Sequence, residues 1–71
     1  MEKEKEDFLI KIGKRVAEIR KGKGITIRQL AEISGISNPD ISDIENGKHS
    51  VGIDRLNKIC KALGVKIKIE K

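Results

Sequence analysis

The chain has 71 residues, with 16 lysines and arginines against 11 aspartates and glutamates, giving a formal net charge of +5. This length allows one domain with one small core, too small to enclose a substrate cavity. The single cysteine excludes a disulfide framework and indicates a reducing compartment. The chain has no apolar run that could span a membrane and no secretory signal, so we expect a cytoplasmic protein whose positive charge favours a polyanionic partner.

The first predicted helix covers about residues 7–21, after a charged and flexible N-terminus at residues 1–6. Helical spacing places four apolar side chains towards the core: Phe8, Ile12, Val16 and Ile19. Gly13 lies inside this helix, where it costs about 1 kcal/mol relative to alanine. We therefore expect another element to pack closely against Gly13.

The second predicted helix covers about residues 26–34. Thr26 precedes it and Gln29 stands three residues later, which is the pattern of a capping box. The apolar residues that include one face of this helix are Ile27, Leu30, Ala31 and Ile33. Gly35 then favours the left-handed backbone that ends a helix.

The third predicted helix covers about residues 37–46 and follows the turn closely. Ser37 is a second N-cap, Pro39 suits the first helical turn, and Ile36 would fill the gap between the helices. Ile41 and Ile44 point inward, and the outward residues are Asn38, Pro39, Ser42, Asp43 and Asn46. Two short helices joined in this way commonly place the second helix in the major groove of DNA. A generic helical hairpin is the alternative.

Charge is distributed unevenly along the chain. The segment 11–28 contains seven basic residues and only Glu18 as an acid, whereas the segment 29–46 contains four acids and no base. A basic frame could hold phosphates while the acidic third helix selects bases. The alternative is that these lysines form an ordinary solvated surface.

A fourth helix is predicted over about residues 53–63, with an apolar stripe of Leu56, Ile59, Cys60 and Leu63. Val65, Ile67 and Ile69 then alternate with polar residues, a period of two that indicates a strand over residues 65–71. A lone strand leaves its backbone groups unpaired, so the same strand of a second copy is the simplest partner. A helix extension and a disordered tail are the alternatives.

Residues 12–64 resemble the lambda-repressor-like, Xre/Cro-type helix-turn-helix domain. The matching landmarks, in order, are IGKRVAEIR, TIRQLAEISGIS and ISDIENGK. The resemblance implies an all-α, compact four- to five-helix domain that binds operator DNA, usually as a dimer. The C-terminal strand departs from the family and is similar to the ending of HipB-like antitoxins.

The resemblance also implies roles for individual residues. Arg20 and Glu45 correspond to a structural ion pair, and the base-edge positions are Asn38, Pro39, Ser42 and Asp43. The phosphate positions are Thr26, Ile27, Arg28, Asn46, Lys48, His49 and Ser50. Ser37 and Asp40 complete the candidate DNA-binding set, although Asp40 also suits a helix-end charge that favours the dipole. Many family members have glutamine at Ile27, and isoleucine cannot hydrogen-bond a phosphate.

We therefore expect a sequence-specific DNA-binding regulator, a repressor acting as a homodimer, with double-stranded operator DNA as its partner. Asn38 can pair with adenine, and Asp43 can accept from cytosine. We expect no enzymatic activity and no cofactor, because His49 and the distant Cys60 do not make a metal site. The alternative is an antitoxin that binds a protein toxin and regulates its own operon.

Overall fold

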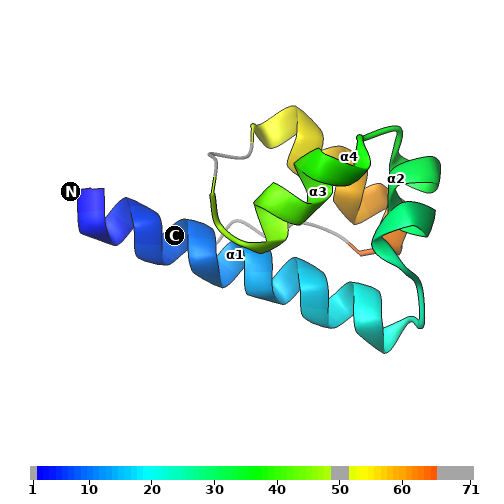
Figure 1. The fold of residues 1–71 in the computed structure, drawn as a ribbon, viewed down its shortest axis with the longest axis horizontal. Coiled ribbons are helices and arrows are strands. Elements are labelled where there is room, and N and C mark those ends of the chain that lie inside the picture. Colours follow the sequence, from blue (N-terminus) through cyan, green and yellow to red (C-terminus); the bar gives the residue numbers. More distant parts are fainter. Residues whose placement is uncertain (1, 49–51, 66–71) are drawn as a thin grey trace.

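A computed structural model describes residues 2–48 and 52–65, with side chains from residue 7 onward. These ranges contain four helices: α1 (Glu2–Gly22), α2 (Ile27–Ser34), α3 (Asn38–Glu45) and α4 (Ile53–Leu63). α1 is a long rod, and α2, α3 and α4 gather over its C-terminal half (Figure 1). No strand occurs in the described ranges, and residues 66–71 of the predicted strand lie outside them.

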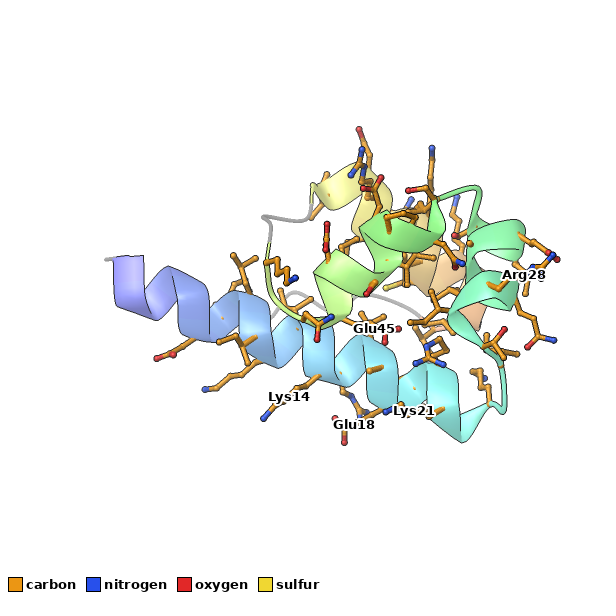
Figure 2. All side chains as sticks on the ribbon, viewed as in Figure 1. Lys14, Glu18, Lys21, Arg28 and Glu45 are labelled. Carbon is orange, nitrogen blue, oxygen red and sulfur yellow. The ribbon has the colours of Figure 1, made fainter. Side chains whose placement is uncertain are left out.

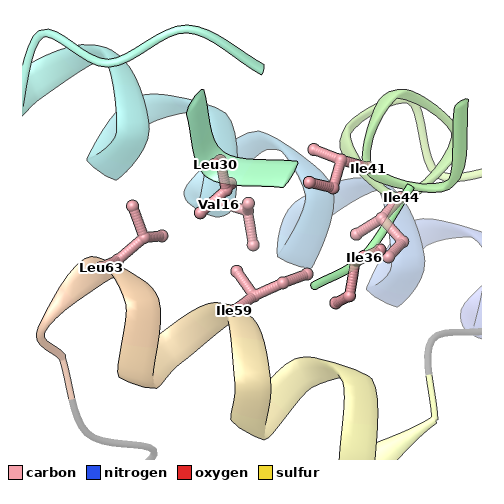
Figure 3. Close-up of a cluster of buried hydrophobic side chains, with 7 residues drawn as sticks. All are labelled: Val16, Leu30, Ile36, Ile41, Ile44, Ile59 and Leu63. Atoms are coloured by element: carbon pink, nitrogen blue, oxygen red, sulfur yellow. The ribbon is translucent and has the colours of Figure 1, made fainter. Parts of the chain in front are cut away.

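The core forms where all four helices meet. Its buried side chains are Val16, Leu30, Ile36, Ile41, Ile44, Ile59 and Leu63 (Figure 3). Leu30, Ile41 and Ile59 are fully buried, and Ile36 fills the space beside the turn as predicted. Because α2 and α3 each contribute only a few residues, their mutual orientation depends on this shared cluster. None of the helices in the described ranges is long and apolar enough to cross a lipid bilayer.

The boundaries of α2, α3 and α4 agree with the predicted ones within a residue, and the caps are as expected. Gly35 and Gly64 end α2 and α4 with left-handed φ values of 75° and 72°. α1 differs, because it begins at Glu2 and not near Asp7. The helix therefore begins about five residues earlier than predicted, and the flexibility of residues 1–6 stays a prediction. Glutamate and lysine are strong helix formers, and acids near a helix N-terminus favour the macrodipole.

Two apolar residues of the predicted helices are exposed: Phe8, which was predicted to face the core, and Ile33, which was placed among the apolar residues of the second helix. Phe8 is 62% exposed, although it shares a helix face with Ile19, which packs against the core. The N-terminal part of α1 projects beyond the other helices (Figure 1), which explains why an apolar residue early in this helix stays exposed. Ile33 is 59% exposed, and it lies more than a quarter turn around α2 from the face that packs on the core.

Gly13 is the point of closest approach between α1 and α3. A Cβ atom at this position would overlap the carbonyl oxygen of Ile44 and lie 2.7 Å from the carbonyl oxygen of Glu45. The backbone at the end of α3 therefore rests on the glycine surface of α1, which confirms the close packing predicted there. This contact sets the distance between the end of α3 and α1.

Candidate nucleic-acid interface

The N-terminus of α2 is closed by the predicted capping box. The hydroxyl of Thr26 accepts from the backbone N–H of Gln29 at 3.0 Å, and the Gln29 side-chain oxygen accepts from the Thr26 N–H at 2.8 Å. The N–H, the carbonyl and the hydroxyl oxygen of Thr26 thus all take part in the helix start, while its hydroxyl keeps a hydrogen that it can donate. The N–H groups of Ile27 and Arg28 belong to the first turn and have no acceptor inside the helix.

This geometry explains how Ile27 can stand where many family members have glutamine. Its side chain is half-buried and packs against the core, so it fixes the start of α2. Its N–H lies at the positive end of the helix dipole, where an anion is favoured. A phosphate contact at this position therefore needs only the backbone.

α3 begins at an exposed and well-capped terminus. The hydroxyl of Ser37 accepts from the backbone N–H of Asp40 at 3.3 Å, and Pro39 lies in the first turn. Asn38 and Pro39 are exposed, and Ser42 is half-buried. The outward side of α3 thus presents polar groups, as the sequence pattern predicted. Asp43, the other base-edge candidate, is also half-buried.

The C-terminus of α3 uses one of the candidate residues for its own structure. The Asn46 side-chain amide donates to the carbonyl oxygen of Ser42 at 2.8 Å. Asn46 is nevertheless exposed, and an amide retains a second N–H and an acceptor oxygen for a ligand. Lys48 is exposed just beyond the helix, where its N–H donates to the Asp43 carbonyl at 2.9 Å.

Behind α3, Arg20 and Glu45 form a two-bond fork. Arg20 Nε donates to Glu45 Oε2 at 2.7 Å and Nη2 donates to Oε1 at 3.1 Å, while Nη1 donates to the Ile25 carbonyl at 2.8 Å. The hydrogen bonds that Arg20 donates to the Glu45 carboxylate raise the pKa of Arg20 against the opposing effect of burial. The guanidinium therefore ties the end of α3 to both α1 and the loop before α2.

The acidic residues of segment 29–46 mostly face basic partners. Glu45 pairs with Arg20, Asp40 with Arg55 of α4 at 3.5 Å, and Glu32 with Arg28 at 3.8 Å. The Arg20–Glu45 pair is buried, while the other two pairs are exposed and contribute little to stability. The segment is consequently less repulsive to phosphates than its sequence suggests. The sequence offered no signal for the Asp40–Arg55 pair, because the two residues lie on different helices.

The structure brings the two predicted parts of the interface together. Ile27 at the start of α2 and Ser42 and Asn46 of α3 line one open groove beside α1. Arg28 is the second residue of α2, and Figure 2 shows its place on that helix. His49 and Ser50 lie outside the described residues, as do Ile67 and Ile69. Val65 packs against the core of its own chain, and its N–H donates to the Cys60 carbonyl at 2.9 Å.

A model of a helix-turn-helix family matches residues 16–69. The chain belongs to the lambda-repressor-like helix-turn-helix family. The landmarks that suggested this resemblance all lie on the helices just described. The matched range contains α2, the turn at Gly35 and α3.

Several proteins with this helix-turn-helix are similar to the chain. The HTH-type transcriptional regulator PuuR of Escherichia coli is 42% identical over 55 residues, which is 78% of this chain and 30% of the regulator. The immunity repressor protein of Bacillus phage phi105 is 32% identical over 56 residues, 79% of this chain and 39% of the repressor. The chain thus spans only about a third of the length of these curated relatives.

A solved structure matches over nearly its full length. The restriction-modification controller protein C.AhdI from Aeromonas hydrophila superposes with a TM-score of 0.83 at 30% sequence identity. The match covers 84% of this chain and 91% of the controller protein.

Proposed function

We propose that this chain is a sequence-specific, double-stranded DNA-binding transcriptional regulator that inserts α3 into the major groove. The observation that carries the proposal is the division of α3 into two sides. Ile41 and Ile44 hold one side against the fold, and the Arg20–Glu45 fork holds the C-terminal end of the helix, while Asn38 is exposed and Ser42 is half-buried on the remaining surface. A helix that is fixed to the fold on one side and carries accessible polar groups elsewhere can present those groups to base edges.

Phosphate contacts would flank this reading helix. The N–H groups of Ile27 and Arg28 would hold one stretch of backbone at the dipole end of α2. Lys48, exposed after α3, would contact the other side of the groove, with His49 and Ser50 following it in sequence. Ser37 and Thr26 contribute chiefly as helix caps.

The direction of regulation follows the relatives. One similar protein is an immunity repressor and others are transcriptional regulators by name, so we favour repression by occupancy of an operator. The antitoxin alternative gains no support from these relatives. Finding a protein toxin that copurifies with the chain at high salt would revive it.

Selection of bound duplexes from a random library, read at two salt concentrations, tests the function directly. Specific enrichment of one motif that persists at the higher salt is the expected result, because base contacts depend less on salt than phosphate contacts do. Equal retention of all duplexes, or no retention in dilute buffer, would refute sequence-specific binding.

We further propose a homodimer that reads two half-sites about one helical turn apart. The alternation of Val65, Ile67 and Ile69 supports pairing of residues 65–71 between copies. Since Val65 already packs on its own core, a chain ending at Val65 is the sharper test. It should sediment as a monomer and lose operator affinity, and a truncated chain that remains dimeric would exclude the strand interface.

A further inference from the structure

The groove between α1 and α3 has a side that the helix-turn-helix itself does not supply. Ile27, Ser42 and Asn46 line it from α2 and α3, and the opposite side comes from α1. The α1 residues that line it include Lys14, Ala17, Glu18 and Lys21. The groove therefore joins candidate DNA-contacting residues to a charged face of the first helix.

Three of these α1 residues form a continuous stripe. Lys14, Glu18 and Lys21 are spaced i, i+4 and i+7, so they share one helix face, and Figure 2 shows them projecting from the same side of α1. All three are exposed. The two lysines are separated by about 10 Å of helix rise, at 1.5 Å per residue.

Unlike Arg28 and Arg55, the two lysines form no ion pair with the side chains that the structure describes. Within the described residues, Arg28 pairs with Glu32 and Arg55 pairs with Asp40, whereas no ion pair joins Lys14 or Lys21 to another described side chain. Between the two sides, Arg20 is neutralised by Glu45. The positive charge left in the groove therefore belongs to the two lysine ammonium groups.

We propose that this groove is a binding site for the phosphodiester backbone of one DNA strand, with Lys14 and Lys21 as its phosphate-contacting residues. This inference rests on the proposed function. The backbone would pass the N–H groups at the start of α2 beside Ile27 and run along α1 between the lysines and the edge of α3. A DNA strand fits better than a small anion, because the groove is open and its charges are spread over two helical turns.

Glu18 allows a test in which the expected change in DNA affinity has the opposite sign to that for the lysines. It lines the same groove between the two lysines, so its carboxylate would repel the strand that they attract. Removing that charge should strengthen binding to every DNA sequence, whereas removing either lysine should weaken it. Solvated charges that lie farther from the DNA than the screening length would give the same signs but much smaller changes in affinity.

The experiment compares Lys14→Gln, Lys21→Gln and Glu18→Gln with the unchanged chain. The probe is a duplex carrying the motif enriched by selection, together with a scrambled duplex, titrated between about 50 and 200 mM salt. Each lysine variant should lower affinity for both duplexes by about tenfold at 0.1 M salt and reduce the salt slope by about one unit. Glu18→Gln should raise affinity for both by about threefold.

Lys58→Gln is the matched control, because Lys58 is also an exposed helical lysine but does not line the groove. It should behave as the unchanged chain does, and an equal loss at Lys58 would show a general charge effect and overturn the site. The phosphate site would also be overturned if the lysine variants kept the salt slope of the unchanged chain. Intact motif enrichment would in that case leave the proposed function standing. Absence of enrichment in the unchanged chain would instead refute the proposed function. Thermal unfolding of each variant verifies that it is folded.

Discussion

Gly13 of α1 lies directly against the backbone of Glu45 at the end of α3, close enough that a Cβ atom would come within 2.7 Å of the Glu45 carbonyl oxygen. The same Glu45 carries the carboxylate that Arg20 holds from α1. The backbone and the side chain of one residue are thus both attached to the first helix. The position of α3 is set at this residue.

Gly13→Ala should destabilise the fold although alanine is the better helix former. The intrinsic gain is about 1 kcal/mol, but the added methyl group meets backbone atoms that cannot rotate away. Overpacking of this kind costs about 1–3 kcal/mol or more, so we expect a net loss of about 2 kcal/mol in urea unfolding. Gly22→Ala is the control on the same helix, since a Cβ there meets nothing within 4 Å. Equal stability of the two variants would contradict the close contact.

Glu45→Ala should lower the free energy of unfolding by about 3 kcal/mol, because it leaves the buried Arg20 guanidinium without its carboxylate. Arg20→Lys, with Glu45 kept, should also lower the free energy of unfolding, since lysine cannot form a two-bond fork. Glu32→Ala, which breaks an exposed pair, should change stability by less than about 1 kcal/mol. Similar losses for Glu45→Ala and Glu32→Ala would refute the structural role of the fork.

The contribution of Arg20 to the free energy of unfolding should not change between neutral and moderately alkaline pH. Its pKa is raised from a value that is already high, so the stabilisation is present below the unfolded-state pKa and is lost only as pH rises through the still higher folded-state pKa. Both pKa values lie above the pH range of this comparison. Comparing the stability difference between the unchanged chain and Arg20→Ala at about pH 7 and about pH 10 checks this. A difference that shrinks at the higher pH would show another titrating group in the contact.

Thr26→Ala should cost about 1 kcal/mol by removing the hydroxyl that caps α2. Thr26→Ser keeps the acceptor and should be nearly neutral. If Thr26 acts on DNA only through the position of α2, a duplex titration far below the melting temperature should show a small and sequence-independent loss for Thr26→Ala. A change in the preferred motif would instead place Thr26 at a base.

Asn38→Ala and Lys48→Ala should separate base reading from phosphate contact. Asn38 lies on the outward side of α3, so its loss should weaken the preferred motif by about 1–3 kcal/mol and relax the choice at one base pair. Lys48→Ala should weaken all duplexes alike and reduce the salt slope by about one unit. If Asn38→Ala weakened all duplexes alike and Lys48→Ala relaxed the choice at one base pair, α3 would dock in a different orientation.

The local sequence was sufficient for the helices from residue 26 onward. Caps, glycines and apolar spacing act over a few residues, so the capping box at Thr26, the turn at Gly35 and the burial of Ile36 could all be predicted. The exposure of Phe8 could not, because it depends on where α1 extends beyond its neighbours. The helical start at Glu2 was missed because a run of charges was interpreted as solvated coil.

The candidate interface was predictable where a family pattern exists and not where contacts depend on tertiary placement. The positions of Arg20 and Glu45 followed from the resemblance. The Arg55–Asp40 pair and the bond from Asn46 to the Ser42 carbonyl did not, because they depend on how helix ends meet. The groove beside Lys14 and Lys21 likewise appears only once α1 and α3 are placed side by side.

The two-sided construction of α3 means that recognition and folding can change independently. Residues such as Asn38 contribute nothing to the buried cluster, and Ile41 and Ile44 are out of reach of any base. Duplication of such a chain followed by substitutions on the outward side would yield paralogues with new operators and undiminished melting temperatures. The same property makes this small scaffold suitable for reprogramming DNA preference without redesigning its interior.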